Sequence, residues 1–207
     1  MRSLCNLCGL LFISLLFFGA LSGCAPSATK SQRLTLARDI HRDTDAARRL
    51  SAQALPLIDQ AKWNDAEAIL QNALDADITY GPAHNNLGTV YMNEGNLYQA
   101  AWEFQYAAKL MPYQPQPKNN LGLALEAAGK LDDAVTCYDQ ALQIEPDNPD
   151  VLGNEARARI RRGDKDDKVR QLLEKLQTID TRPQWVEWAR ERLVMLGPSS
   201  TQPQDIP

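Results

Sequence analysis

Asparagine side chains recur at a fixed interval between residues 85 and 154 and are the clearest candidates for binding chemistry. Asn86, Asn120 and Asn154 are spaced 34 residues apart, and Asn85 and Asn119 precede two of them. A carboxamide carries a donor and an acceptor together, so it can pair with both polar groups of a peptide bond. The series therefore indicates sequence-tolerant binding to a polypeptide main chain. The alternative is that these asparagines hydrogen-bond neighbouring helices to one another.

The residue types that carry most enzyme chemistry form no recognisable site in this sequence. The two histidines, His41 and His84, are far apart, and His84 is expected to pack inside the fold. Zinc-ligand spacings, phosphate-binding glycine loops and nucleophile elbows do not occur. Asp132-Asp133 stands at a predicted helix start, where acidic side chains favour the helix dipole, and Cys137 is predicted to be a small buried residue. We therefore expect no enzyme, no cofactor and no metal ion.

The asparagine series belongs to a longer repeat that relates residues 81–114 to residues 115–148. Matched positions carry similar residues, pairing Leu87-Gly88 with Leu121-Gly122, Gly95 with Gly129, Ala100 with Ala134, Phe104 with Tyr138, Ala107 with Ala141, and Pro112 with Pro146. A 34-residue period with small residues at fixed places is typical of a helix-turn-helix solenoid unit.

The small residues of this repeat have expected structural roles. Gly88 and Gly122 should lie where the two helices of a unit approach closely. Gly95 and Gly129 can take the left-handed conformation that ends the first helix. The prolines that close each unit cannot continue the second helix.

These spacings resemble the tetratricopeptide repeat (TPR) family. The resemblance implies an all-α fold, a right-handed superhelix of helix-turn-helix units whose first helices line the concave face. Inward-facing asparagines on those helices resemble the ladder by which some arrays hold an extended peptide. The candidate groove residues on this basis are Asn85, Asn86, Thr89, Asn93, Asn119, Asn120, Leu123, Asn154 and Arg157.

The repeat extends in weaker form on both sides, which defines a helical domain over residues 46–197. An irregular unit is expected at 47–80, where Pro56 should kink a helix. A degenerate unit at 149–182 is followed by a capping helix at 183–196, because stacked units leave an apolar end to cover. Trp185 and Trp188 are predicted to be core residues of that cap. Residues 198–207 are rich in Pro, Ser and Gln and are expected to be disordered.

The first 23 residues have the pattern of a signal peptide, with an apolar run at 7–21 that is too short for a spanning helix of ~20 residues. Leu21-Ser22-Gly23-Cys24 resembles the lipobox of bacterial lipoproteins, which implies cleavage before Cys24 and acylation of its thiol. Ala25 after the cysteine implies, by that family's sorting rule, the outer membrane. Residues 24–45 then form a polar tether. An ordinary signal peptide or an uncleaved anchor is the alternative.

Charge is distributed unevenly along the chain. Residues 24–154 hold 10 Lys and Arg against 17 Asp and Glu, whereas residues 155–207 hold 11 against 9. Arg157, Arg159, Arg161 and Arg162 fall in one predicted helix, either as a solvated face or as a docking patch for an acidic partner or lipid headgroups. A sequence pI of about 5.2 and the predicted export disfavour nucleic acid.

The resemblances combine into one expected function, a lipid-anchored scaffold of the bacterial cell envelope that faces the periplasm and binds proteins. Lipoproteins of this architecture include assembly factors for type IV and Flp/Tad pili. They also include adaptors for cell-wall enzymes or outer-membrane protein assembly. Pilus or secretin assembly is the leading hypothesis, and the adaptor role is the alternative.

Overall fold

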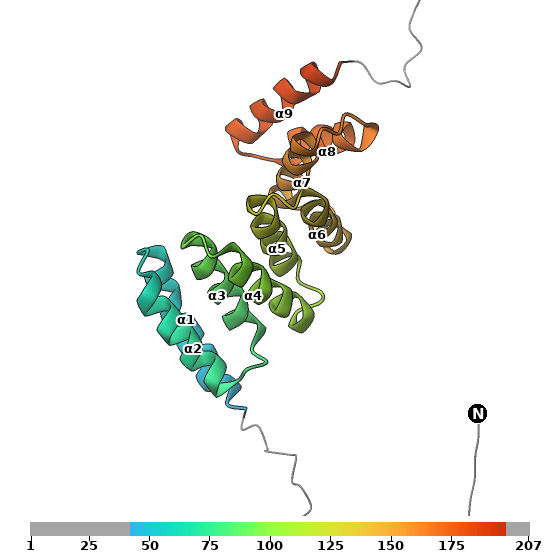
Figure 1. Ribbon diagram of the computed structural model, residues 1–207. Helices are drawn as coiled ribbons and strands as arrows, with labels where there is room; N and C mark the ends of the chain where they lie inside the picture. Colours follow the sequence, from blue (N-terminus) through green and yellow to red (C-terminus); the bar gives the residue numbers. More distant parts are fainter. Residues whose placement is uncertain (1–41, 198–207) are drawn as a thin grey trace, which may run out of the picture. The chain divides into compact units, whose positions relative to one another are not determined.

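The computed structural model describes residues 42–197, and within that range the chain forms helices and no strand (Figure 1). The nine helices of this range are α1 (Thr44–Asp59), α2 (Trp63–Ala76), α3 (Gly81–Asn93), α4 (Leu97–Leu110), α5 (Pro115–Ala127), α6 (Leu131–Ile144), α7 (Pro149–Arg162), α8 (Asp167–Ile179) and α9 (Pro183–Leu196). The predicted signal peptide, Cys24, most of the predicted tether and the tail 198–207 lie outside the described residues.

The helices stack as antiparallel pairs, α1 with α2, α3 with α4, α5 with α6 and α7 with α8, and each helix packs against the next along the chain. The first helices of the pairs, α1, α3, α5 and α7, also contact one another in order. The second helices make no comparable contacts among themselves within the described residues. The first helices therefore line the closely packed inner side of the stack, and the second helices are spread along its outer side. The predicted all-α solenoid is confirmed.

Two glycines set the distance between the helices of the central units. A Cβ atom at Gly88 would lie 2.7 Å from the Phe104 ring, and one at Gly122 would lie 2.5 Å from the Tyr138 ring. Both aromatic side chains are fully buried. The close approach predicted at these positions is confirmed, because each aromatic ring occupies the space that a larger residue would need.

Glycines also end the first helix in three units. Gly95, Gly129 and Gly163 have φ angles of 80°, 77° and 101°, the left-handed region that other residues rarely adopt. This is the predicted role of Gly95 and Gly129. The second helices α4 and α6 end two residues before Pro112 and Pro146, as the sequence predicts.

The first unit begins slightly earlier than the sequence indicates, because α1 starts at Thr44 and takes in the last residues of the predicted tether. The Asp43 side chain accepts the amide hydrogen of Ala46 and caps this helix. The Thr44 hydroxyl donates to Asp77 at 2.6 Å, which ties the helix start to the end of α2 and lowers the pKa of the Asp77 carboxyl. Pro56 lies in the last turn of α1, where it lacks the amide hydrogen that would bond to the Ala52 carbonyl oxygen.

The fourth unit and α9 share a separate hydrophobic cluster. Its buried side chains are Leu152, Ala156, Val169, Leu172, Leu173, Leu176 and Ala189. Trp185 and Trp188 pack against this cluster with their rings edge to face, 5.4 Å apart. A Cβ atom at Gly153 of α7 would lie 3.0 Å from the Trp185 ring. The two tryptophans are therefore part of the cap core, as predicted.

No helix between residues 42 and 197 has both the length and the apolar composition needed to cross a membrane.

Candidate functional site

The asparagines of the first helices are hydrogen-bonded to one another across the units. Asn120 Nδ2 donates to Asn85 Oδ1 at 3.1 Å, which joins α5 to α3. Asn154 Nδ2 donates to Asn119 Oδ1 at 2.9 Å, which joins α7 to α5. Asn120 and Asn154 thus each donate to the asparagine that stands 35 residues earlier, in the preceding unit. Hydrogen bonding between neighbouring helices, the alternative role that the sequence suggests for these asparagines, is therefore present. These bonds also fix the orientation of the carboxamides.

A serine provides the first acceptor of this row. Asn86 Nδ2 donates to Ser51 Oγ on α1 at 3.1 Å, and Ser51 is buried. Ser51 stands 34 residues before Asn85, so the repeat spacing points to it, but a search for asparagine alone misses it. The inter-unit row therefore begins one unit earlier than the asparagines indicate.

Asn86, Asn119 and Asn120 are half-buried and keep bonding capacity toward solvent, whereas Asn85 and Asn154 are buried. A carboxamide has two N–H donors and an oxygen with two lone pairs, and each inter-unit bond uses one of these groups. Asn119 and Asn120 also line a pocket of about 490 Å³ at the start of α5. The other residues of its lining are Gln114, Pro115, Gln116, Glu145, Asn148, Asp150 and Val151. Because most of this lining is polar, the pocket suits a polar group such as a peptide backbone.

The remaining candidate residues of α3 and α5 lie further along these helices. Thr89 Oγ1 donates to the Asn85 carbonyl oxygen at 3.1 Å, and Asn93 Nδ2 donates to the Thr89 carbonyl oxygen at 2.8 Å. Leu123 packs against the buried cluster that contains Tyr138. Thr89 and Asn93 thus bond to their own helix, and neither lines the pocket at Asn119 and Asn120.

Arg157, the last of the predicted groove residues, is bound to a buried carboxylate. Its Nε and Nη2 atoms both donate to Glu126 at 3.0 Å, Arg161 Nη1 donates to the same carboxylate at 2.7 Å, and Tyr138 Oη donates at 2.9 Å. Burial by itself raises the pKa of Glu126, but the hydrogen bonds from Arg157 and Arg161 outweigh it and hold the pKa below its usual range. Burial, together with the Glu126 carboxylate, raises the pKa of Tyr138.

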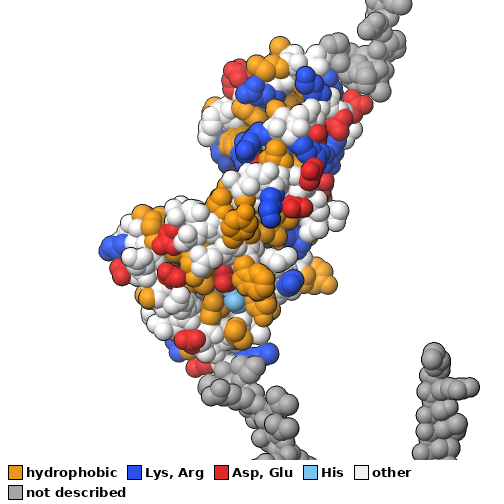
Figure 2. Space-filling view, in the orientation of Figure 1, with side chains coloured by type: hydrophobic (Ala, Val, Ile, Leu, Met, Phe, Trp, Pro, Cys, Tyr) orange, Lys and Arg blue, Asp and Glu red, His pale blue; other side chains and the backbone are white. Residues whose placement is uncertain are grey.

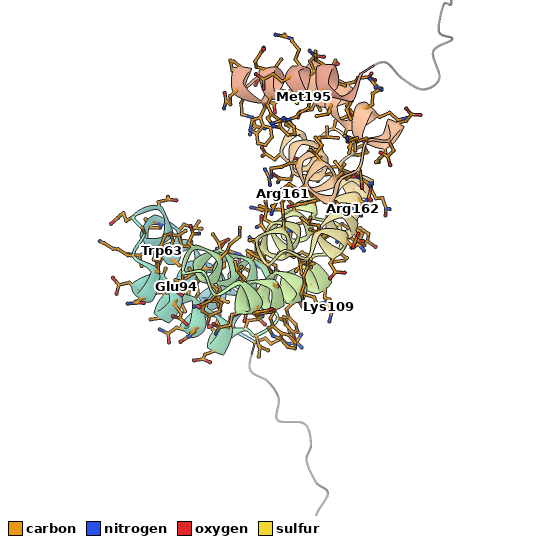
Figure 3. All side chains as sticks on the ribbon, turned by 45° about the horizontal axis from the view of Figure 1, so that its top comes forward. Trp63, Glu94, Lys109, Arg161, Arg162 and Met195 are labelled. Carbon is orange, nitrogen blue, oxygen red and sulfur yellow. The ribbon has the colours of Figure 1, made fainter. Side chains whose placement is uncertain are left out.

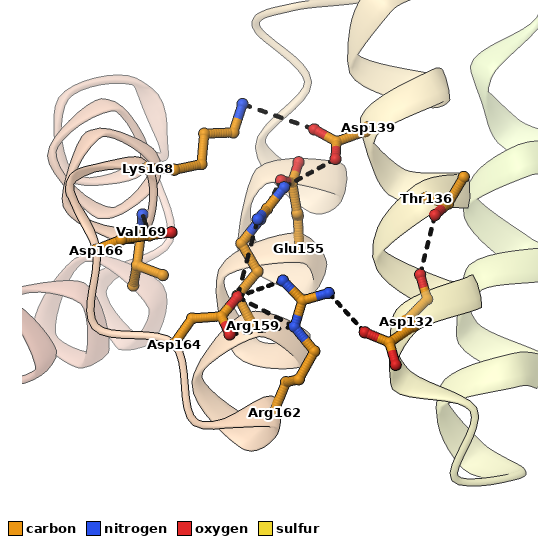
Figure 4. A network of polar contacts seen from close by, with 10 residues as sticks. All are labelled: Asp132, Thr136, Asp139, Glu155, Arg159, Arg162, Asp164, Asp166, Lys168 and Val169. Atoms are coloured by element: carbon orange, nitrogen blue, oxygen red, sulfur yellow. Dashed lines mark hydrogen bonds and ion pairs between the residues drawn. The ribbon is translucent and has the colours of Figure 1, made fainter.

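The other two arginines of α7 bind acidic residues of α6, of the turn before α8 and of α7 itself (Figure 4). Arg159 donates to Glu155 at 2.6 Å and to Asp139 at 2.8 Å. Arg162 donates to Asp164 and to Asp132, and its hydrogen bond with Asp164 raises its pKa.

All four arginines of α7 are therefore paired with carboxylates, although Arg161 and Arg162 leave the helix in different directions (Figure 3). The carboxylate partners restrain these side chains, of which Arg161 remains half-exposed. The arginines join α7 to α5 and α6, a role that no sequence spacing reveals because the partners on those two helices are 20 to 35 residues away.

Glu155 is the most enclosed carboxyl group of this network. Its Oε1 atom accepts from Arg159, whereas its Oε2 atom has no hydrogen-bond partner in the described structure, and the side chain is fully buried. Burial raises the pKa of Glu155, and the hydrogen bond from Arg159 opposes that effect only in part.

His84 combines packing with polar contacts. The ring is buried and meets the Tyr106 ring edge to face, as expected for a packing role. Its Nδ1 lies 2.6 Å from Glu103 Oε2 and its Nε2 lies 2.8 Å from the Ile78 carbonyl oxygen. Among residues 42–197, no three His, Cys, Asp or Glu side chains are grouped so that they could hold a metal ion.

Comparisons with known proteins identify the repeat. Residues 116–148 match the family model of the tetratricopeptide repeat. No curated protein sequence matches the chain. Among solved structures, the first TPR of Spaghetti (RPAP3) bound to the HSP90 peptide SRMEEVD superposes with a TM-score of 0.58 and 22% identity, covering 60% of this chain and 99% of that one.

Two further solved structures are similar to this chain. The Arabidopsis OM64 TPR domain gives a TM-score of 0.55 at 18% identity and covers 57% of this chain and 98% of its own. MamA gives a TM-score of 0.56 at 18% identity and covers 74% and 83%, respectively. At these identities the likeness establishes the fold, which is that of a tetratricopeptide repeat solenoid.

Proposed function

We propose that this tetratricopeptide repeat solenoid is a scaffold that binds an extended peptide segment of a partner protein along its inner side. The observation that carries the proposal is the row of oriented carboxamides on α3, α5 and α7, with a polar pocket beside Asn119 and Asn120. The similar Spaghetti domain is bound to a peptide, which supports a protein partner.

The inter-unit bonds favour binding because they hold the carboxamides in place before a ligand arrives. Ordering a side chain at an interface costs about 0.5–1.5 kcal/mol, and a side chain that is already fixed avoids most of that cost. Carboxamides bond to the main chain, which is the same in every peptide, so the groove is expected to tolerate different sequences.

The test replaces Asn86, Asn120 and Asn154 by alanine in the full chain and compares the product with a Ser51→Ala variant. Each substitution should remove hydrogen bonds to the partner that are worth ~0.5–1.5 kcal/mol each. The triple variant should therefore bind its partners about thirty-fold more weakly or worse. Ser51→Ala removes one inter-unit bond and leaves every asparagine in place, so it should lower the melting temperature slightly and keep binding.

Two measurements read the outcome, thermal unfolding and recovery of partner proteins from a bacterial envelope extract. Because the asparagines join the helices, the triple variant is expected to be less stable than the wild type as well as weaker in binding. A triple variant that is less stable but recovers the same partners at the same strength would contradict the proposal. The row would then serve only to join the units.

We further propose that the chain is anchored at Cys24 in the outer membrane, facing the periplasm, and serves in pilus or secretin assembly. The lipobox resemblance at Leu21–Cys24 and the solenoid fold support this proposal. The alternative is an adaptor for cell-wall enzymes or outer-membrane protein assembly. Loss of secretin multimers on deletion favours the first role, whereas co-purification with peptidoglycan synthases or hydrolases favours the second.

A further inference from the structure

A second groove lies on the outer side of the stack, where α4 and α6 are spread apart over α5. It has a volume of about 390 Å³ and is lined by Tyr98, Ala101, Trp102, Gln105, Leu121, Leu125, Asp133, Thr136 and Cys137. Leu121 and Leu125 come from α5, between the two outer helices. Figure 2 shows hydrophobic side chains gathered over the part of the molecule that α4 and α5 form.

Two large aromatic side chains of this groove are unusually exposed. Tyr98 is 76% exposed and Trp102 is 68% exposed, although both lie on a well-packed helix. The two residues are one turn apart on α4, so they lie on the same face of the helix. Lys130 lies 5.5 Å from the centre of the Tyr98 ring and supports that ring from the turn before α6.

The repeat itself shows that the fold does not require these aromatic residues. One unit earlier, the positions of Tyr98 and Trp102 hold Asn64 and Ala68. One unit later they hold Asp132 and Thr136, and these side chains are exposed as well. Tyrosine and tryptophan at exposed positions that other units fill with small or polar residues point to contact with another molecule.

The charge at the edge of the groove indicates the chemistry of that molecule. Asp133 lines the groove, is exposed and takes part in no ion pair within residues 42–197, whereas its neighbour Asp132 is bound by Arg162. Lys130 lies over the Tyr98 ring, and Lys118 donates to the Pro112 carbonyl oxygen at 2.9 Å. A cation is therefore the complementary charge at this edge.

We propose that the outer groove between α4 and α6 binds a segment of a partner protein that presents a large apolar side chain next to an arginine or lysine. The apolar side chain lies against Trp102, Leu121 and Leu125. The basic side chain pairs with Asp133. This site is separate from the asparagine row, which lies on the first helices, so the chain holds one contact surface on each side of the stack.

The experiment selects binders from a displayed library of random 12-residue peptides against the full chain. The enriched peptides are expected to carry an aromatic or large aliphatic residue and an adjacent basic residue. Trp102→Ala should weaken their binding at least tenfold, and Asp133→Lys should weaken it at least fivefold, because the charge at the edge is reversed.

Matched controls separate the groove from general effects of charge and apolar surface. Asp65→Lys changes an exposed aspartate at the same position two units earlier, and Tyr113→Ala removes an aromatic that is 87% exposed but outside the groove lining. Both controls should keep binding, and so should the triple asparagine variant described above. If Trp102→Ala does not fold, as judged by circular dichroism, Trp102→Gln replaces it.

Three outcomes would overturn the proposal. Peptides that bind equally well to the Trp102 and Asp133 variants would show that the groove is not their site. A selection that enriches acidic peptides or none would exclude a basic, apolar occupant. A chain whose dimer, measured by light scattering, dissociates in the Trp102 variant would show that a second copy covers the groove.

Discussion

Two glutamates on neighbouring inner helices occupy environments with opposite electrostatic effects. Glu126 on α5 accepts hydrogen bonds from Arg157, Arg161 and Tyr138, and the arginines hold its pKa below the usual range against the effect of burial. Glu155 on α7 is fully buried with one oxygen unpaired, and burial raises its pKa. The charged form of Glu126 therefore stabilises the fold, whereas that of Glu155 opposes it.

These shifts predict opposite dependences of stability on pH. The stabilisation of the fold by ionised Glu126 is fully present above the unfolded pKa of about 4.3, and it is lost as the pH falls through the lower folded pKa. The stabilisation of the fold by protonated Glu155 is fully present below the unfolded pKa of about 4.3, and it is lost as the pH rises through the higher folded pKa. Glu126→Gln should therefore differ most from the wild type above pH ~4.3, by ~1.5–3 kcal/mol. Glu155→Gln should gain relative to the wild type as the pH rises above that value.

Urea unfolding of the wild type and both variants between about pH 3 and pH 8 gives the free energies of unfolding. The two variants serve as controls for each other, since both remove one carboxylate from the inner helices. A Glu155→Gln variant whose free energy of unfolding stays parallel to that of the wild type above pH ~4.3 would show that Glu155 is not shifted upward in the folded state.

For single residues, the sequence predicts the position of a side chain in the fold better than it predicts the hydrogen-bond partner of that side chain. The 34-residue interval places Asn86, Asn120 and Asn154 on equivalent turns, because the same spacing generates the units. It does not predict that each asparagine donates to the residue 35 positions earlier, since that depends on how two helices pack. The partners of Arg159 and Arg162 were missed for the same reason.

Helix pairs in the central units depend on a glycine facing an aromatic ring. Gly88→Ala would place a Cβ atom 2.7 Å from the Phe104 ring, which overpacks the pair at a cost of ~1–3 kcal/mol. The higher helix propensity of alanine offsets up to ~1 kcal/mol of that cost. The variant is expected to be destabilised, and thermal unfolding measures the effect.

A double-mutant cycle with Phe104→Leu tests this explanation, because the smaller side chain leaves room for the added methyl group. The combined variant should be less destabilised than the sum of the two single variants. Additive effects would mean that the added Cβ atom is accommodated without strain. Hydrogen exchange should locate the damage in α3 and α4 and show it decreasing with distance, since units couple only to their neighbours.

Helix identity and order could be predicted because the signals are local. Glycines at the helix ends and prolines after them act on their own backbone, so the two central units match the expected bounds closely. The start of α1 differs because its hydrogen bonds reach across to α2, from Asp43 to the Ala76 carbonyl oxygen and from Thr44 to Asp77. The groove at Trp102 was also missed, although an aromatic pair one turn apart is a signal that the sequence contains.

For the molecule as a whole, the proposed anchor is testable by Cys24→Ser. Two or three acyl chains hold a protein at a membrane far better than one, at ~0.8 kcal/mol per buried methylene. The substitution should abolish incorporation of labelled palmitate and release the chain from the membrane fraction. If the chain serves in secretin assembly at the outer membrane, secretin multimers should also decrease.

A matched control is Cys137→Ser, which removes the only thiol of the described residues and leaves Cys24 in place. Burial raises the pKa of the Cys137 thiol to about 11, so it is mostly protonated at neutral pH and unsuited to acylation. Palmitate incorporation that survives Cys24→Ser would reject the lipoprotein proposal, while the solenoid and both proposed binding surfaces would stand.

In the inter-unit row of hydrogen bonds, each donor reaches the preceding unit, and a residue without a polar side chain ends the row on each side. Ala52 stands where α1 would need a donor toward a preceding unit, and Gly153 stands where α7 would need an acceptor for a following one. The Trp185 ring fills the space beside Gly153 instead. Every internal unit brings one acceptor and one donor. An ancestral gain or loss of a whole internal unit would therefore leave no carboxamide without its partner, so the array can change length by duplication while both ends remain closed.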